Sequence, residues 1–497
     1  MQMVLDACGF VGKHTQRKRS ITLLTQNTPA QSTRKPYFAP PPPATQHTTL
    51  TPPITNARYP CHSPDDLVNG RMTTFLDNAV NAHSHTLEKL ELVLPHTNID
   101  PSPVYTHALC TNRIPALCSL RIWGFFPASA TMSLSFRHLR HLSLRNFYRS
   151  LEDTLMSLEE FVGAISTCVE LEELEVQRYH PALTVSEETL QSPIVTLPKL
   201  RKLTVADVPE FFPRLFSCLR VLPTVDVHLV ALFHDPEYPR DGLEAFETFD
   251  LERHKECLPI LDEVTEVTVA TMNTNQEDYG LRIAGSRGEE GGSFLYDIRT
   301  TGSIELMEDV MHRCRLLEWA IQRLSKIFPG KECMRRFKGI GDFRDVKEPS
   351  WVALFQAYPL LEHLEVEGWG VNDASGLIFA LRWLDNAREP GIVDVVCSKL
   401  KSISISGVLY TPELMSAARD TLMRRAKPST QLALQLHMLA CDDAAAYPSD
   451  ARDDDIEFLR KQGVDAAIRV ESLLDHLTRV ALQCGVPVES VECDNES

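Results

Sequence analysis

The chain has 497 residues, of which 43% are hydrophobic and 24% are charged, and its formal net charge is −17. It contains no run of about 18 apolar residues, so we expect no membrane-spanning helix and no membrane partner. The acidic balance argues against nucleic acid as a partner, because binding to the phosphate backbone needs clustered Lys and Arg. We therefore expect a soluble globular protein with an ordinary hydrophobic core.

Residues 1–70 form a polar tail, and residues 1–60 carry seven basic side chains and one acidic one, a net +6 that leaves −23 for the remainder. Residues 13–60 are rich in Thr, Ser, Gln and Pro, including the run Pro40–Pro43. Such a segment buries too little apolar surface to offset its chain entropy, so we expect it to be disordered. A docking peptide in the polyproline II conformation stays open as an alternative. The basic start is also compatible with a nuclear-localisation patch at Gln16–Arg19 or with a transit peptide.

A short pattern of the form apolar-x-x-apolar-x-apolar recurs from residue 87 onward. Its last two apolar positions lie two residues apart, so they face one side of a short β-strand, and the polar residues between them face the other side. The position three residues upstream is also apolar in eight of the nine copies, Ser84 being the exception. The copies lie at Leu87/Leu90/Leu92, Leu117/Leu120/Ile122, Leu139/Leu142/Leu144, Leu171/Leu174/Val176, Leu200/Leu203/Val205, Leu222/Val225/Val227, Val264/Val267/Val269, Leu361/Leu364/Val366 and Leu400/Ile403/Ile405.

Amphipathic stretches between the copies predict helices. Ser157–Glu160 has the sequence of a capping box, and apolar residues follow it at helical spacing. These are Leu158, Phe161, Val162 and Ile165. Similar stripes precede the last two copies, at Trp351/Leu354/Phe355 and at Leu377/Leu381/Leu384. Helix, turn and strand therefore alternate along the chain.

This pattern resembles the core of leucine-rich repeats, in which each unit contributes one parallel strand to a horseshoe. The expected fold is α/β: a leucine-rich-repeat-like solenoid (horseshoe) of parallel strands backed by helices. Residues 71–269 form the main array, and residues 351–410 add further units. Residues 270–350 are an insertion or degenerate repeats, with a Gly-rich loop near Gly288–Gly292 and a helix near 304–328.

The carboxy-terminal region, residues 411–497, is expected to be a helical cap followed by an acidic tail. The cap would extend over residues 456–484 and end at Gly485. A cap is needed because the last repeat would otherwise expose its core. The acidic run Asp453–Asp455 is placed immediately before this helix, where carboxylates interact favourably with the helix dipole.

Four segments carry a family resemblance: LEKLELVLP (Leu87–Pro95), FRHLRHLSL (Phe136–Leu144), SLEEFVGAISTCVELEELEV (Ser157–Val176) and YPLLEHLEV (Tyr358–Val366). They resemble the leucine-rich-repeat half of fungal F-box-like proteins, particularly the divergent families of mushroom-forming fungi. The resemblance covers roughly residues 75–410. In that family an amino-terminal F-box docks on the adaptor of a cullin–RING ubiquitin ligase, and the repeats hold the substrate.

Residues 1–70 depart from that family. They carry proline-rich polar sequence in place of the Leu-Pro signature and the amphipathic helices of an F-box. Leu258-Pro259-Ile260-Leu261 mimics the signature but lies inside a repeat copy. Two explanations stay open, namely loss of the F-box or an incorrect first exon. The resemblance therefore implies partner binding more firmly than ubiquitin transfer.

The sequence contains no recognisable catalytic, cofactor-binding or metal-binding motif, so no residue is predicted to have one of these roles. Gly339–Gly341 lacks the remaining glycine and the preceding strand of a dinucleotide fingerprint, and a loop is the preferred interpretation. The thirteen cysteines contain no CxxC pair, and Cys168 and Cys397 fall at core positions, as is typical of reduced thiols. With no secretory signal at the start, we expect a cytoplasmic or nuclear protein. An enzyme with a site in residues 270–350 is a remote alternative.

Surface recognition remains as the expected activity. On each strand, the residues that flank the inward pair should face the concave side. The middle column of this side holds four acids and one base, which favours a basic or polar protein partner: Glu91, Arg121, Ser143, Glu175, Thr204, Asp226, Thr268, Glu365 and Ser404. The next column contains Trp123 and Arg145, the residue types that most often dominate binding energy. Cover by the nearby segment 125–127 is the alternative for Trp123.

The candidate protein-binding residues are Trp123, Arg121, Arg145, Glu175, Asp226 and Glu365. We expect a monomeric, non-enzymatic protein that binds a protein partner. It would either be the substrate-recognition part of an F-box-type ligase, with the ligase adaptor as a second partner, or a stand-alone repeat scaffold.

Overall fold

A computed structural model of the chain describes its helices and strands with several connecting turns. The described residues are 19–24, 87–93, 115–124, 138–146, 158–178, 194–233, 256–273, 278–288, 291–301, 307–330, 332–343, 346–372, 374–382, 397, 399–425, 433–441, 449–461 and 465–471. The chain divides into two compact units, Met1–Glu188 and Thr189–Ser497. Each unit is mixed α/β and is described by itself.

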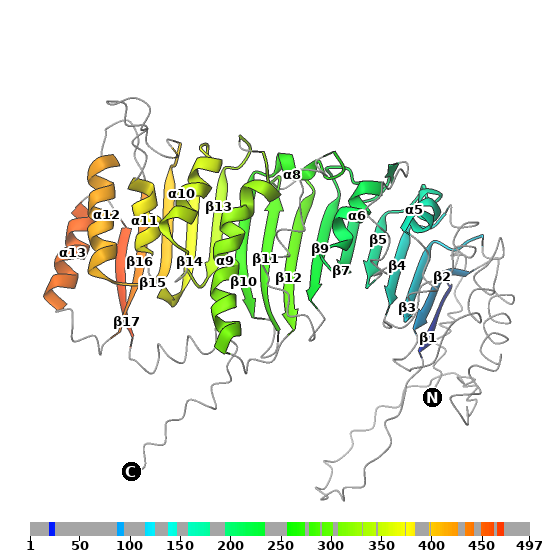
Figure 1. The fold of residues 1–497 in the computed structure, drawn as a ribbon, viewed down its shortest axis with the longest axis horizontal. Coiled ribbons are helices and arrows are strands. Elements are labelled where there is room, and N and C mark those ends of the chain that lie inside the picture. Colours follow the sequence, from blue (N-terminus) through cyan, green and yellow to red (C-terminus); the bar gives the residue numbers. More distant parts are fainter. Residues whose placement is uncertain are drawn as a thin grey trace, which may run out of the picture. The chain divides into compact units, whose positions relative to one another are not determined.

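Unit 1 contains a parallel sheet whose strand order follows the chain order (Figure 1). Its elements are β1 (Arg19–Leu24), β2 (Leu87–Val93), β3 (Ser119–Gly124), β4 (His141–Asn146), α5 (Leu158–Ser166) and β5 (Glu173–Gln177). The apolar stripe of α5 is buried, with Phe161 and Ile165 fully enclosed. The capping-box sequence therefore does precede a helix that packs through the predicted face.

Strand β1 lies in the segment that we expected to be disordered. It pairs in parallel with β2, with Ile21 beside Leu90 and Leu23 beside Leu92. Apolar residues at alternate positions suit a strand, and an edge strand such as β2 offers unpaired backbone groups to it. The expectation of a disordered tail therefore does not hold for residues 19–24. The other residues of 1–70, including the proline run, lie outside the described residues.

Unit 2 contains a larger sheet in the order β7-β9-β12-β11-β10-β13-β14-β15-β16-β17. All neighbouring strands in it are parallel except β11, which is antiparallel to both β10 and β12. The strands are β7 (Lys202–Asp207), β9 (Asp226–Phe233), β10 (Glu266–Asn273), β11 (Asp278–Ser286), β12 (Ser293–Thr301), β13 (Arg336–Gly341), β14 (His363–Asn372), β15 (Ser402–Leu409), β16 (Ala433–Cys441) and β17 (Asp465–Glu471). The short strands β6 (Val195–Thr196) and β8 (Leu219–Arg220) pair separately.

The helices of unit 2 pack on one side of its sheet (Figure 1). They are α6 (Phe211–Cys218), α8 (Ile260–Glu263), α9 (Met307–Ile327), α10 (Glu348–Ala357), α11 (Ser375–Arg382), α12 (Pro412–Arg425) and α13 (Ser449–Lys461). Helix α9 falls where a helix near 304–328 was expected. The core lies between helices and sheet: Trp351 of α10 meets Phe337 of β13 edge-on at 6.2 Å between ring centroids. Phe212 and Tyr296 join α6 to β12 in the same way at 6.1 Å.

In eight of the nine copies of the apolar pattern, the last two apolar positions lie on a strand, and in the copy at Leu222 only Val227 does. Their register aligns the copies in unit 1, where Leu120 lies beside both Leu90 and Leu142. The copy at Leu222 is shifted by two residues, because Leu203 of β7 lies beside Val227 of β9. Val225 belongs to the turn before β9, where its N–H bonds the Leu222 carbonyl. The residue beside Thr204 is consequently His228, and Asp226 lies one row lower.

The region 270–350 places two additional strands inside the sheet. Strands β11 and β12 form a hairpin between β9 and β10, and the Gly-rich loop is its turn. A Cβ atom on Gly292 would lie 2.6 Å from the Val225 carbonyl oxygen, so only glycine fits beside β9 there. Strand β13 follows as a further parallel strand. The preferred loop interpretation of Gly339–Gly341 is therefore wrong: these residues end a strand in the middle of the sheet.

The expected helical cap at residues 411–497 is replaced by two further helix–strand steps, as far as residue 471. Strand β16 pairs with β15, and β17 pairs with β16, both in parallel. Leu434, Leu436 and Met438 of β16 are buried on the helix side. The run Asp453–Asp455 lies within α13 and not before it. Residues 472–497 lie outside the described residues.

Candidate functional site

Each sheet has one side against which its helices pack and a second side that no described helix covers. On every strand alternate side chains belong to this second side, which we call the open face of that unit. In unit 2, for example, Val227 and Leu229 are buried among core residues, and His228 between them lies on the open face. Because the helix side buries the apolar residues, most of the polar and charged side chains of the strands lie on the open face.

Three predicted residues meet on the open face of unit 1 around Trp123 of β3. The guanidinium carbon of Arg121 lies 5.0 Å from the centre of the half-buried Trp123 ring, and that of Arg145 lies 5.6 Å from it. The indole N–H donates to Ser143 Oγ at 3.3 Å, and that hydroxyl donates to Glu175 at 2.8 Å. We call Arg121, Trp123, Ser143, Arg145 and Glu175 the Trp123 cluster.

Arg121 of this cluster also pairs with an acidic side chain on the neighbouring strand. Arg121 donates to Glu91 on β2 at 3.2 Å, and Glu175 also accepts from Gln177. Cation–π contacts at exposed sites contribute about 0.5–1 kcal/mol each. The cluster therefore holds a large aromatic ring in a fixed orientation on a surface that other side chains leave partly accessible.

Glu365 of β14, a predicted binding residue in unit 2, lies on the open face and forms an ion pair. Lys338 Nζ of β13 donates to it at 2.5 Å and lies 3.8 Å from Glu367. The hydrogen bond to Glu365 raises the pKa of Lys338 above its usual range, against the smaller opposing effect of burial. Exposed pairs of this kind contribute about 0–1 kcal/mol to stability. Glu365 therefore remains available for exchange with an external charge.

Asp226, the other predicted binding residue in unit 2, has a structural role. One of its carboxylate oxygens accepts hydrogen bonds from the backbone N–H of Ser293 at 2.9 Å and from its hydroxyl at 2.7 Å. Ser293 is the first residue of β12. Asp226 therefore fixes the point where the inserted hairpin joins β9, and its row on the open face differs from the one predicted.

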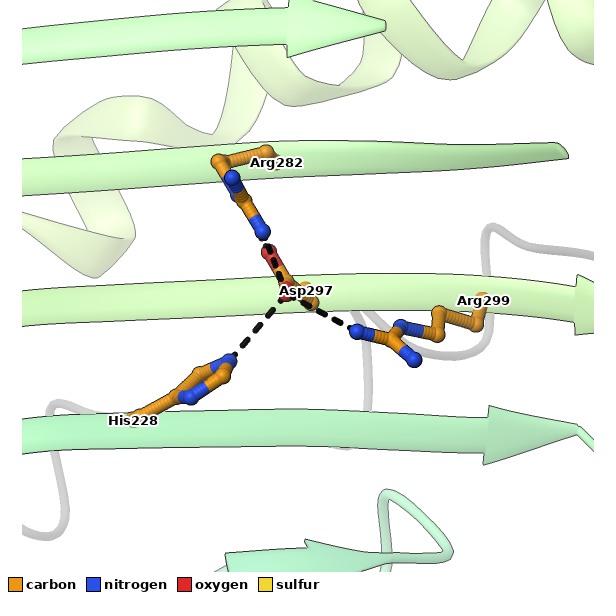
Figure 2. Close-up of polar contacts among 4 residues, drawn as sticks. All are labelled: His228, Arg282, Asp297 and Arg299. Atoms are coloured by element: carbon orange, nitrogen blue, oxygen red, sulfur yellow. Dashed lines mark hydrogen bonds and ion pairs between the residues drawn. The ribbon is translucent and has the colours of Figure 1, made fainter. Parts of the chain in front are cut away.

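The strongest charge cluster of the described residues lies where this hairpin enters the sheet (Figure 2). Asp297 of β12 has a side chain with 0% exposure. Arg282 of β11 donates to it through Nε at 2.8 Å and through Nη2 at 2.9 Å, and His228 Nε2 donates at 3.1 Å. Arg299, two residues further along β12, approaches it at 3.6 Å. We call these four residues the Asp297 cluster.

The electrostatics of the cluster keep Asp297 ionised. Burial alone would raise the pKa of Asp297, but the hydrogen bonds from Arg282 and His228 outweigh it and bring the pKa well below its usual range. The same carboxylate raises the pKa of Arg282. A carboxylate only accepts hydrogen bonds, so the Nε2 atom of His228 carries a proton. Two guanidinium groups facing one carboxylate leave an excess positive charge.

Small and apolar side chains surround this charge. The register places Val230 of β9 and Ala270 of β10 on either side of the Arg282–Asp297 pair. Leu295, two residues before Asp297, occupies the same face and is half-buried. An apolar surrounding strengthens the electrostatic interactions inside it, because the local dielectric is lower than that of water.

None of the four residues of the Asp297 cluster was among the predicted binding residues. The signal was present in the sequence: two alternating segments, DYGLRIAGS and SFLYDIRTT, flank a Gly-rich turn, which is typical of a β-hairpin. A charged residue between Tyr296 and Ile298 then belongs to the face opposite the core. The predicted residues of unit 1 do come together, whereas Asp226 and Glu365 of unit 2 lie in different rows.

The part of the chain that the structure describes contains no cluster of side chains suited to bind a metal ion. No group of three His, Cys, Asp or Glu side chains there is arranged to hold an ion. Asp455, in the acidic run considered above, accepts instead from the Tyr410 hydroxyl at 2.8 Å and from Arg419. It thereby ties α13 to α12. Among the described helices, none is long and apolar enough to cross a membrane.

Comparison with known proteins adds no family assignment. No protein-family model matches the sequence, and the comparison with curated proteins found no match. The functional argument therefore rests on the geometry of the open faces.

Proposed function

We propose that the chain is a non-enzymatic, leucine-rich-repeat-like solenoid protein whose open faces bind another protein. Outside the inserted hairpin of β11 and β12, the parallel strands of each unit follow one another in chain order, which supports this class, as do the helices on one side of each sheet. So does the distribution of side chains between the two sides: apolar residues, most aromatic rings included, fill the helix side, and charged residues together with Trp123 lie on the open face. Proteins of repeat type present such a surface to their partners.

The Trp123 cluster is the observation that carries this proposal. Trp and Arg are the residue types most enriched at binding hot spots, and here one Trp lies between two Arg on a partly accessible surface. The ring is already oriented by its bond to Ser143. Little side-chain entropy is therefore lost when a partner covers it.

The ligase role is the more specific form of the proposal. In it, the open faces recognise a substrate, and another part of the protein contacts the adaptor of a cullin–RING ubiquitin ligase. The alternative is a stand-alone scaffold without that link. The two are separated by mixing the purified full chain with the ligase adaptor: a stable complex supports the ligase role, and no complex supports the scaffold.

Protein binding itself is tested by affinity purification with three baits: the wild type, Trp123→Ala and Val169→Ala. Val169 is an apolar residue of unit 1 that is 49% exposed, so its substitution removes exposed apolar surface away from the cluster. We expect at least one protein to be recovered by the wild type and Val169→Ala and lost with Trp123→Ala. Identical recovery by all three baits would contradict binding through the Trp123 cluster.

A further inference from the structure

We propose that the Asp297 cluster is a docking point for a single carboxylate side chain, Asp or Glu, of a protein partner. This inference rests on the proposed function, because it assigns partner chemistry to the open face of unit 2. The partner charge proposed here is opposite to the one predicted from the middle column of the sequence, which favoured a basic or polar partner. The inserted hairpin causes the difference, since it brings two arginines onto this part of the face.

The two arginines of the cluster have different roles. Arg282 is committed to Asp297, which accepts from both its Nε and its Nη2 within 2.9 Å. Arg299 approaches the same carboxylate only at 3.6 Å, beyond hydrogen-bond length. Its Nε is buried and has no hydrogen-bond partner among the described residues, so a ligand would reach this guanidinium group through its Nη atoms. Because its contact with Asp297 is long and its side chain is 43% exposed, Arg299 has more capacity to bind a ligand than Arg282 has.

The charge balance selects a monoanion. Arg282 and Arg299 together carry two positive charges, and the ionised Asp297 neutralises one of them. One unit of positive charge remains for a ligand, which matches one carboxylate and falls short of a phosphate dianion. A guanidinium group binds a carboxylate in a fixed planar geometry, so the interaction is directional as well as electrostatic.

The surroundings favour a carboxylate that belongs to a protein chain. Leu295 borders the cluster on the open face and is half-buried, so it offers apolar contact, whereas Val230 beside Asp297 is buried. A partner that carries the acid can therefore place an apolar neighbour against Leu295. Asp297 acts as a positioning residue in this arrangement: it holds Arg282 and keeps the local charge at one positive unit.

A random-peptide display library, selected against the full chain, tests this inference without knowledge of the natural partner. We expect the selected peptides to share an acidic residue at a fixed position. The best of them is then synthesised in three forms, with Glu, Gln or phosphoserine at that position. Their affinities are measured by fluorescence anisotropy for the wild type, for Arg299→Ala and for Arg336→Ala, the last being a matched control because Arg336 is 61% exposed on the same face and pairs with Glu266.

Replacing Glu by Gln should weaken binding to the wild type about tenfold, the effect expected for a charged hydrogen bond. The same replacement should have little effect on Arg299→Ala, and Arg336→Ala should behave as the wild type within about twofold. Thermal unfolding of each variant checks that it is folded.

Four results would overturn the inference. Three of them are peptides with no shared acid, a Gln effect that persists in Arg299→Ala, and a selection with no binder that depends on Arg299. The fourth is much tighter binding of the phosphoserine form, which would show that the site prefers a phosphate to a carboxylate. Each of these outcomes leaves the Trp123 bait experiment unaffected, so failure here is distinguishable from failure of the proposed function.

Discussion

Arg282 and Asp297 lie directly opposite each other on the antiparallel strands β11 and β12 and share two hydrogen bonds, at 2.8 and 2.9 Å. The pair links the two strands of a hairpin that interrupts an otherwise parallel sheet. Its carboxylate is fully buried, whereas the Arg282 side chain is 40% exposed. The same ion pair therefore links the two strands of the hairpin and holds the positive charge of Arg282 at the surface.

Removing either arginine of the Asp297 cluster should affect stability unequally. Arg282→Ala leaves a buried carboxylate without its main donor, and we expect the free energy of unfolding to fall by about 2 kcal/mol. Arg299→Ala removes only a long contact of a partly exposed side chain, and the expected loss is below about 1 kcal/mol. Urea unfolding of both variants measures the difference. Equal losses would show that the two arginines share the carboxylate evenly.

The contribution of Asp297 to stability should depend on pH. Its pKa in the folded protein is lower than its ordinary value, so the stability it contributes is fully present above that ordinary value, about pH 4. It is lost as the pH falls through the lower folded pKa. The stability difference between the wild type and Asp297→Asn should therefore be largest at neutral pH and shrink below about pH 4. A difference that stays constant over this range would contradict an ionised, hydrogen-bonded Asp297.

Substitution of Trp351, in the core, should lower the stability of the protein much more than substitution of Trp123, on the surface. Trp351 is 2% exposed and stacks on Phe343 and Phe355 at 5.8 and 6.4 Å, so Trp351→Ala should lower the free energy of unfolding by about 3–5 kcal/mol. Trp123→Ala should cost about 1 kcal/mol, because it removes mainly cation–π contacts at a partly exposed site. Chemical unfolding tests both. A large loss for Trp123→Ala would assign that ring to the core.

Thiol reactivity should report on the helix side of unit 1. Burial raises the pKa of Cys168 to about 11, with a smaller opposing effect of its hydrogen bond with Thr167. We expect Cys168 to be alkylated much more slowly at pH 8 than the half-buried Cys118 and Cys333. Mass spectrometry after timed alkylation gives the individual rates. Fast labelling of Cys168 in the folded protein would mean that the contact between α5 and the sheet is open.

Much of the sheet could be predicted because each strand buries two apolar residues at a spacing of two. Leu142 and Leu144 illustrate this, since both lie below 2% exposure. The pattern failed where one of these positions is occupied by a residue without a large side chain. Gly339 of β13 is such a case: Phe343 fills the space, and a Cβ atom would come within 3.0 Å of its ring.

The Asp297 cluster escaped prediction for a different reason. Its four residues come from three strands, two of which belong to an insertion that does not follow the repeat. Pairing between β9 and β12 is non-local, and the shift that places His228 beside Thr204 arises in the turn at Val225. The Trp123 cluster was predictable because its members occupy neighbouring copies in regular register.

The central claim, binding through the open face, is tested most directly by the affinity of the captured partner for Trp123→Ala. The equilibrium dissociation constant is measured by isothermal titration calorimetry for the wild type, Trp123→Ala and Val169→Ala. We predict that Trp123→Ala weakens binding at least about 30-fold, the effect of a hot-spot residue, and that Val169→Ala changes it less than about twofold. Equal affinities for the wild type and a folded Trp123→Ala would contradict the claim.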